Sequence, residues 1–295
     1  MKKTILITGI SVYLGSHLAY AFSKDFKIVG LKLKRSNSKK LSKIINAIEL
    51  YNVEENGIIK VFDNQKINVI IHCATNYGRN EESFLNIIDA NIYFPLKLLK
   101  LAIDNRVDCF INTDTILNKF ISEYALSKKH FKDWLQFYSN KIKVINLILE
   151  HFYGPFDGPN KFISCIIEKI LANEKEIHLT KGEQERDFLY IDDLVNAYKI
   201  ILNNLESIKN NFTEFEIGSG KTITIKQIVT LIKKFSNNDR TKLNFGAIPY
   251  REKEKMKSEC NIDKIKQLGW EPEISIQEGV KKIIELEKTR CSDQK

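Results

Sequence analysis

An α/β fold, with a doubly wound parallel sheet followed by a smaller mixed α/β domain, is predicted by three features of this sequence. Short apolar runs alternate with longer helical patterns through the first half of the chain, as in parallel sheets covered by helices. A glycine-containing turn joins the first apolar run to the first helical pattern. After residue 152 the alternation becomes irregular, and Gly, Pro, Asn and Asp cluster from Tyr153 to Asn160, which indicates a domain boundary.

The elements follow from hydrophobic periodicity. Strands are expected at the apolar runs Thr4–Thr8, Lys27–Leu31, Ile58–Phe62, Val69–His72, Cys109–Thr113 and Val144–Leu149. Helices are expected over Leu14–Ser23, Glu82–Asn105 and Ser122–Tyr138. We expect a first domain over residues 1–152 and a second over 153–295. Whether later segments return to the first sheet stays open.

Composition narrows the class of protein. Of 295 residues, 43% are hydrophobic and 28% charged, and no apolar stretch approaches the length of a membrane span. Without a signal-peptide pattern, we expect a cytoplasmic protein. The net charge of +9 is spread along the chain, so a small anionic ligand is favoured over nucleic acid. Five scattered cysteines indicate reduced thiols and no metal site: Cys73, Cys109, Cys165, Cys260 and Cys291.

The turn after the first apolar run has the features of a phosphate-binding loop. In a Rossmann unit, backbone N–H groups of such a loop and the following helix N-terminus bind the pyrophosphate of a dinucleotide. Gly9 and Gly15 hold the outer positions, and Val12 replaces the middle glycine, so Ser11 or Tyr13 is expected to contribute a hydroxyl. The residues expected to bind cofactor here are Gly9, Ser11, Val12, Tyr13, Leu14 and Gly15.

The end of the second strand favours NADP(H). An acidic residue there would bond the ribose of NAD, whereas basic residues accommodate the extra phosphate of NADP. Lys34 and Arg35 follow the strand and no acidic residue does, although NAD(H) stays open. Asp63 is expected after the third strand, beside the adenine or in a plain turn. Ala74 and Thr75 follow the fourth strand, where the cofactor should cross the sheet.

Tyr124 and Lys128 have the spacing of a proton-transfer site. Residues four apart share one face of a helix, and a nearby ammonium favours the phenolate. We therefore expect Lys128 to lower the pKa of Tyr124 into the working range. Thr113 stands 11 residues upstream, at a predicted strand end.

Taken in order, these motifs resemble the extended short-chain dehydrogenase/reductase family, the NAD-dependent epimerases and dehydratases. The resemblance covers nearly the whole chain and includes Ile70–Ala74, Tyr153–Pro155, Gly182–Asp193 and Leu268–Pro272. It implies that Thr113, Tyr124 and Lys128 are the catalytic trio. It also implies a nucleotide-diphosphate sugar as substrate and a homodimer. The apolar stripe from Asn91 to Leu101 and the helix from Ser122 either form the dimer face or cover the sheet.

The family pattern also implies substrate contacts. Arg186 and Arg251 match two arginines that clamp the substrate diphosphate, where a bidentate guanidinium suits phosphate oxygens. A salt bridge from Arg186 to Asp187 or Asp192 is the alternative. His151 stands where many relatives carry Asn, and is either a substrate or nicotinamide contact or a structural histidine. The residues expected along the nucleotide are Asn160, Lys161 and Phe162.

Within the family, the sequence most resembles 4-ketoreductases of nucleotide-linked 4-keto-6-deoxy sugars, which serve deoxysugar synthesis for O-antigen or capsule. Dehydratases of the family read Thr-Asp-Glu where this chain reads Thr113-Asp114-Thr115, so dehydration is disfavoured. A C4-epimerase that retains NAD is the main alternative. A non-catalytic NADP-binding regulator is a further one, although such proteins commonly lose the Tyr or the Lys.

Overall fold

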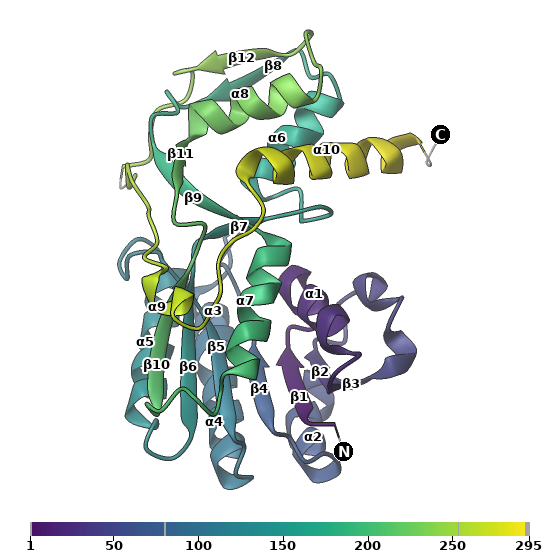
Figure 1. Ribbon diagram of the computed structural model, residues 1–295, viewed down its shortest axis with the longest axis vertical. Coiled ribbons are helices and arrows are strands. Elements are labelled where there is room, and N and C mark those ends of the chain that lie inside the picture. The colour runs from purple at the N-terminus through teal and green to yellow at the C-terminus, as the bar shows by residue number, and fades with distance from the viewer. Residues whose placement is uncertain (1, 80, 253, 293–295) are drawn as a thin grey trace. The chain divides into compact units, whose positions relative to one another are not determined.

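The computed structural model describes residues 2–79, 81–252 and 254–292 (Figure 1). The chain divides into two units, of which the first comprises Met1–Leu149 and Tyr198–Phe215. The second comprises Glu150–Ala197 and Glu216–Lys295. Among the helices of the described residues, none combines the length and the apolar character of a membrane span.

The first unit is built on a seven-stranded sheet of order β10-β6-β5-β4-β1-β2-β3. Its strands are β1 (Thr4–Thr8), β2 (Lys27–Lys32), β3 (Ile48–Asn52), β4 (Val69–His72), β5 (Cys109–Thr115), β6 (Lys143–Leu149) and β10 (Phe212–Ile217). All pairings among β1 to β6 are parallel. The direction in which strands are added reverses between β1 and β4, where Thr8 pairs with His72. Ligands of such sheets bind beyond the carboxyl ends of the strands at this switch point.

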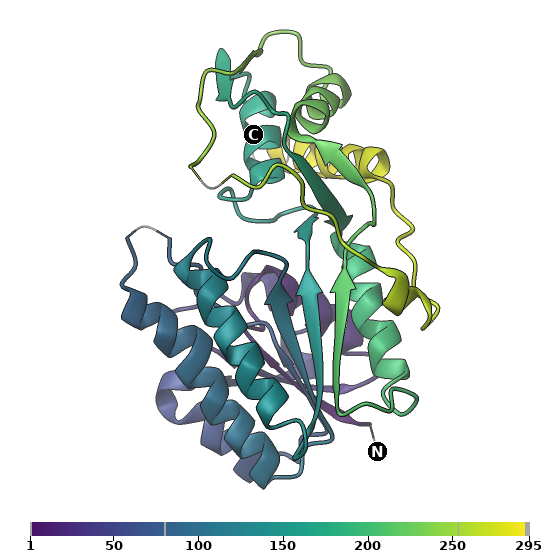
Figure 2. The ribbon, with the colours of Figure 1, turned by 90° about the vertical axis from the view of Figure 1, so that its left-hand side faces the viewer.

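Helices cover both faces of this sheet (Figures 1 and 2). They are α1 (Tyr13–Phe22), α2 (Gly57–Asn64), α3 (Phe84–Ile88), the π-helical turn η4 (Asp89–Tyr93), α4 (Phe94–Asp104) and α5 (Glu123–Phe137). Short 3-10 turns are η1 (Lys39–Leu41), η2 (Ile45–Ala47) and η3 (Val53–Glu55). Figures 1 and 2 place α4 and α5 on one face and α1 on the other. The helices predicted over Leu14–Ser23 and Ser122–Tyr138 are confirmed. They correspond to α1 and α5, and each end differs by one residue.

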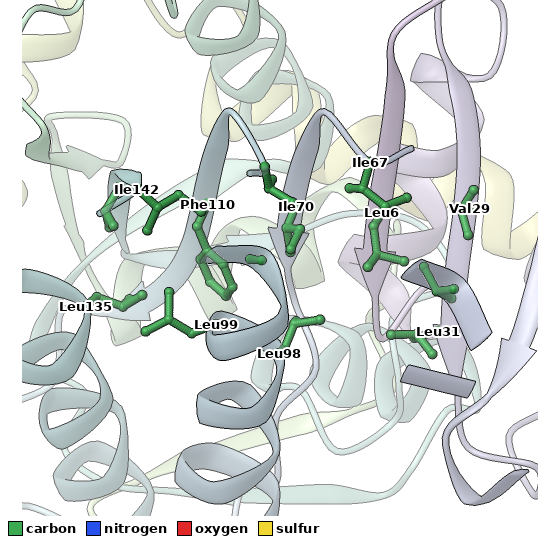
Figure 3. Packing of buried hydrophobic residues seen from close by; sticks show 14 of the residues in the cluster. Leu6, Val29, Leu31, Ile67, Ile70, Leu98, Leu99, Phe110, Leu135 and Ile142 are labelled. Atoms are coloured by element: carbon green, nitrogen blue, oxygen red, sulfur yellow. The ribbon is translucent and has the colours of Figure 1, made fainter. Parts of the chain in front are cut away.

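A continuous apolar core joins the sheet to α2, α4 and α5 (Figure 3). Leu6, Ile70 and Phe110 come from the sheet, whereas Leu98 and Leu135 come from α4 and α5. Each such side chain contributes roughly 1.5–3 kcal/mol when it leaves water. The strands of this parallel sheet are apolar on both faces because helices cover both.

The predicted strand at Ile58–Phe62 is wrong. These residues lie in helix α2, and the third strand is β3, which starts ten residues earlier, at Ile48. Ile58, Val61 and Phe62 pack on the core while Ile59 is 53% exposed, which is helical rather than alternating periodicity. The placement of Asp63 after a strand is wrong for the same reason, because Asp63 lies in the last turn of α2. A helix that follows a parallel strand runs back to the opposite edge of the sheet, away from the switch point.

The second unit holds two small sheets. In the three-stranded sheet, β9 (Glu185–Tyr190) pairs with β7 (His151–Tyr153) in parallel and with β11 (Thr222–Thr224) antiparallel. In the other, β8 (Glu176–Leu179) pairs in parallel with β12 (Lys242–Phe245). The helices are α6 (Phe162–Leu171), α8 (Ile225–Phe235), α9 (Asp263–Lys266) and α10 (Ile276–Ser292). Helix α7 (Ile191–Asn203) starts in the second unit and continues into the first from Tyr198.

The Leu268–Pro272 motif has a structural role in this unit. Trp270 is 1% exposed and its indole N–H donates to the Asp193 carbonyl at 3.1 Å. The Asp193 carboxylate accepts the backbone N–H groups of Glu273 and Ile274. This motif therefore fixes the segment before α10 to the start of α7.

Candidate functional site

The loop after β1 requires glycine at both outer positions. Gly9 has φ +64°, and a Cβ there would lie 2.9 Å from the Cα of Ala74. A Cβ on Gly15 would lie 2.2 Å from the Gly9 carbonyl oxygen. Side chains at either position would therefore displace the loop from the strand ends or from the helix.

Val12 is compatible with a phosphate at this loop because its side chain faces outward. It is extended at the N-cap of α1, with φ −83° and ψ 174°, and is 48% exposed. Beyond it, the first-turn N–H groups of Tyr13, Leu14 and Gly15 have no intrahelical acceptor. Ser11 is buried, and the Tyr13 ring packs edge-on against His17. The loop thus presents the backbone donors that a pyrophosphate requires.

Lys34 and Arg35 lie exposed after β2, as expected, but acidic residues accompany them. The Lys34 Nζ is 3.2 Å from Glu55, and its backbone N–H donates to the Glu54 carboxylate at 2.9 Å. Hydrogen bonds from Asn52 and Lys34 lower the pKa of Glu55. These glutamates follow β3. Because the sequence predicts the third strand at Ile58–Phe62 instead, it does not place them beside Lys34. The region accordingly offers groups suited to NADP and groups suited to NAD.

Tyr124 and Lys128 lie one turn apart on α5, which follows the Ser122 cap. The Tyr124 ring lies 4.9 Å from the ring of Tyr77. Lys128 is 2% exposed and acts electrostatically on Cys73, at the end of β4. The ammonium is therefore close to the carboxyl end of the strand where the cofactor should cross.

Thr113 lies on β5 in a cluster of hydroxyls. Its Oγ1 is 2.7 Å from the Tyr198 phenol oxygen and 3.6 Å from the Cys73 sulfur. Thr115 shares its face of the strand because side chains alternate, and the Thr115 side chain hydrogen-bonds Tyr124. Thr113, Thr115 and Tyr124 thus belong to one polar site of the first unit.

The expected lowering of the Tyr124 pKa is not observed. Burial raises the pKa of Tyr124 well above its ordinary value, with Tyr77 and Asp114 adding to the rise and the Thr115 hydrogen bond opposing it. Burial also lowers the pKa of Lys128 from 10.5 to about 8, although Asp114 opposes this change. The spacing of Tyr124 and Lys128 predicts only the effect of one charge on the other. Desolvation has the larger effect on both pKa values here. Tyr124 is therefore a neutral phenol, suited to donating a proton.

Asp114 has a structural role on the other face of β5. Its carboxylate accepts from Lys129 and from the Asn146 amide, each at 3.1 Å. Its other oxygen accepts the Thr115 N–H at 2.7 Å. These bonds occupy both oxygens and fix the strand end that carries Thr113.

Asn91 belongs to this part of the first unit, although the sequence motifs do not indicate it. It lies in η4, a π-helical turn of a kind frequent at functional sites. Its amide oxygen accepts from Thr75 and from the Asn76 N–H, and its amide nitrogen donates to the Asn76 carbonyl and to Ser127. Asn91 therefore ties the loop after β4 to the helix of Tyr124. An asparagine inside an apolar helical stripe was the available signal.

His151 is oriented by the preceding residue. Its ring Nδ1 lies 2.9 Å from the Glu150 carboxylate, which also accepts the His151 N–H. The second Glu150 oxygen accepts a hydrogen bond from Ser258. Because Nδ1 is engaged, Nε2 is the ring nitrogen available to a ligand. The ring packs edge-on against Phe188.

Arg186 forms its ion pair with Glu254, rather than with Asp187 or Asp192. The Glu254 backbone N–H donates to the carbonyl of Arg251 at 3.0 Å, so both arginines belong to one local cluster. Arg251 is exposed. This part of the second unit therefore presents two guanidinium groups, one of which already holds an anionic oxygen.

The remaining predicted residues precede or begin α6. Asn160 is exposed, Lys161 is the helix N-cap, and Phe162 is 38% exposed at the first helical position. The Lys161 ammonium lies 5.8 Å from the centre of the Phe152 ring.

A sequence profile of the NAD dependent epimerase/dehydratase family matches residues 5–218. The chain belongs to this family. CDP-abequose synthase from Salmonella typhimurium is 36% identical over 96% of this chain and 98% of that protein. The CDP-abequose synthase of Salmonella muenchen is 33% identical over 97% and 98%. The expected family and fold class are confirmed.

Among solved structures of the family fold, a UDP-glucose 4-epimerase from Thermotoga maritima, crystallised with UDP-glucose, superposes with a TM-score of 0.85. It is 25% identical, covering 98% of this chain and 99% of that one. Family membership makes this chain a nucleotide-sugar-modifying enzyme of the short-chain dehydrogenase/reductase type, which uses an NAD(P) dinucleotide.

Proposed function

We propose that this enzyme is an NADPH-dependent reductase of a nucleotide-activated 4-keto-6-deoxy sugar, similar to CDP-abequose synthase. The observation that carries the proposal is the environment of Tyr124. Its phenol is kept neutral by burial, and the side chain on β5 that hydrogen-bonds it is the Thr115 hydroxyl rather than a carboxylate. Such a site donates one proton to a ketone oxygen. The near-full-length similarity to CDP-abequose synthases supports the substrate class.

The chemistry divides between the cofactor and the chain. When bound, the nicotinamide supplies a hydride to the carbonyl carbon. Tyr124 transfers its O–H proton to the carbonyl oxygen, which completes the alcohol and leaves a phenolate on the residue. Thr113 hydrogen-bonds that oxygen as negative charge develops on it. The Lys128 ammonium favours the phenolate, and its proposed second role is to contact the nicotinamide ribose.

Substrate binding is assigned to the second unit. Arg186 and Arg251 hold the diphosphate, where the Glu254 carboxylate now stands in for one anionic oxygen on Arg186. Asn160, Lys161 and Phe162 line the nucleotide, and the Nε2 of His151 contacts the sugar. The product enters deoxysugar synthesis for surface polysaccharide in the cytoplasm.

A C4-epimerase is the second candidate. The similarity to a UDP-glucose 4-epimerase favours it, as does the salt bridge that occupies Lys34 and weakens the case for NADP. A dehydratase is disfavoured because Thr115, not a carboxylate, reaches the Tyr124 phenol.

The deciding experiment follows absorbance at 340 nm with CDP-, dTDP- and GDP-linked 4-keto-6-deoxyhexoses, with NADPH and NADH in parallel. The reductase consumes NADPH stoichiometrically with one nucleotide series and yields the 4-hydroxy sugar. Interconversion of 4-hydroxy sugars without net consumption, with NAD retained by the purified protein, would establish the epimerase instead.

Cofactor preference is tested by replacing both Lys34 and Arg35 with alanine. We expect KM for NADPH to rise about tenfold or more, because contacts to a charged phosphate are worth about 1.5–3 kcal/mol, while KM for NADH changes little. Lys43→Ala, at an exposed lysine further along the loop, is the control. Equal losses with both cofactors would show that this segment does not read the extra phosphate.

A homodimer is proposed from exposed apolar side chains on α3 and α5, which lie side by side. Phe84, Leu85, Trp134 and Phe137 are 43–72% exposed, an apolar surface that monomers seldom leave in water. Light scattering is expected to give twice the chain mass, and Phe137→Glu to give a folded monomer. Ile59→Glu, at an exposed position of α2, should stay dimeric. A wild-type monomer would refute the assignment.

A further inference from the structure

We propose that Tyr198 is a positioning residue for Thr113. Its phenol donates a hydrogen bond to the Thr113 oxygen, which leaves the Thr113 hydroxyl hydrogen for the substrate oxygen. The inference rests on the proposed function in one respect, namely that Thr113 contacts the reacting oxygen. The hydrogen bond itself lies within the first unit.

Geometry connects the two side chains directly. Tyr198 lies on α7, is 0% exposed, and its oxygen is 2.7 Å from Thr113 Oγ1. Across the described parts of the chain, this phenol oxygen has one hydrogen-bonding partner, Thr113. Thr113 is less buried, as a residue that meets substrate must be.

The direction of the bond follows from hydroxyl chemistry. Each hydroxyl has one hydrogen to donate and lone pairs to accept with. Burial raises the pKa of Tyr198 well above its ordinary value, so its O–H stays protonated. If Thr113 donated instead, the phenol O–H would be buried without an acceptor, which is the costlier arrangement. Tyr198 is therefore the donor and Thr113 the acceptor.

The Thr113 hydrogen is then available for another acceptor. Apart from Tyr198, the hydrogen-bonding partner of Thr113 Oγ1 among the described residues is the Cys73 sulfur at 3.6 Å, and thiol sulfur is a weak acceptor. Burial raises the pKa of Cys73 to about 12, so it remains a thiol rather than a strongly accepting thiolate. A carbonyl oxygen that develops negative charge would displace it readily. Tyr198 also polarises the Thr113 hydroxyl, because hydrogen bonds in a chain strengthen one another.

A double-mutant cycle tests the proposal. Tyr198→Phe keeps the ring and removes only the O–H. We expect kcat to fall about five- to twentyfold with KM nearly unchanged, since one neutral hydrogen bond acts mainly in the transition state. In a Thr113→Val background, the same replacement should change kcat less than twofold. Tyr190→Phe, at another buried phenol, should leave kcat unchanged.

The cycle uses whichever turnover the wild type shows, reduction or C4 epimerisation, because Thr113 serves the same oxygen in both. If neither is found, the proposed function fails. Urea unfolding still tests whether Tyr198 and Thr113 form the hydrogen bond. Thr113→Val should destabilise the wild type clearly, and Tyr198→Phe/Thr113→Val no more than Tyr198→Phe alone. Additive stability changes, or a Tyr198→Phe effect on kcat that persists without Thr113, would overturn the assignment.

Discussion

Replacing Tyr124 with phenylalanine is expected to lower kcat by about 10²–10⁴-fold, the range that a positioned proton donor contributes. The ring should still pack at 4.9 Å from Tyr77, so the fold and the binding of NADPH and nucleotide sugar should persist. The change removes only the proton that completes the alcohol. Steady-state consumption of NADPH gives kcat, and fluorescence titration of NADPH gives Kd.

Tyr138→Phe is the matched control, because this tyrosine caps the end of the same helix away from Thr113 and should retain full turnover. The Tyr124 variant also separates catalysis from regulation. A non-catalytic NADP-binding regulator would keep its function without the phenol. Retention of more than a tenth of wild-type turnover would mean that another group supplies the proton.

Local sequence signals predicted the parts of the site that depend on neighbouring residues. Gly9 and Gly15 are required because backbone atoms of the loop and of the segment after β4 leave no room for a Cβ. The spacing of glycines in the sequence therefore indicates these close contacts directly. Tyr124 and Lys128 are one helical turn apart, so helix periodicity alone places them on one face. The parallel sheet was predictable because strands covered on both faces are continuously apolar.

The third strand was missed because a five-residue apolar run fits a strand or a helix equally well. Ile58–Phe62 is helical, whereas Ile48–Asn52, with Glu49 and Tyr51 within it, forms the strand. Its half-buried side chains gave a weaker apolar signal. As a result, the sequence placed Asp63 after a strand, and it did not indicate that Glu54 and Glu55 follow the third strand.

Other parts of the site depend on contacts that spacing does not encode. Tyr198 reaches Thr113 from 85 residues away, and Arg186 pairs with Glu254 from 68 residues away. Burial likewise depends on the complete fold, which is why the sign of the Tyr124 pKa shift was unpredictable from its distance to Lys128. Desolvation is a property of all surrounding atoms, whereas the sequence pattern shows one charged neighbour.

Lys128 is the residue at which this desolvation should cost stability. Its side chain is 2% exposed and burial lowers its pKa from 10.5 to about 8. At pH 7 the lysine is charged in the folded and the unfolded chain, so the folded state bears the full penalty of a buried charge. A shift of this size corresponds to about 3 kcal/mol. The catalytic role that we propose for Lys128 explains why the chain keeps a residue that opposes its own folding.

Lys128→Met is therefore expected to abolish turnover and to raise the free energy of unfolding at pH 7 by about 3 kcal/mol. The sign follows from proton uptake. Between the folded pKa of about 8 and the unfolded value of 10.5, the unfolded wild type binds more protons, so wild-type stability rises with pH. The advantage of the variant should be constant below pH 8 and shrink towards pH 10.5, as urea unfolding at a series of pH values would show.

The adjacent Lys129 provides a control of opposite sign. Its ammonium pairs at 3.1 Å with Asp114, whose side chain is fully buried. Lys129→Met leaves that carboxylate without its countercharge and should destabilise the protein, since breaking a buried pair costs about 3–5 kcal/mol. Two neighbouring lysines on one helix should thus respond oppositely to the same substitution. The Lys129 ammonium has a carboxylate partner at bonding distance, whereas the buried Lys128 ammonium opposes folding and is retained, as we propose, for catalysis. Destabilisation by Lys128→Met of the same size would show that its ammonium is already paired in the fold.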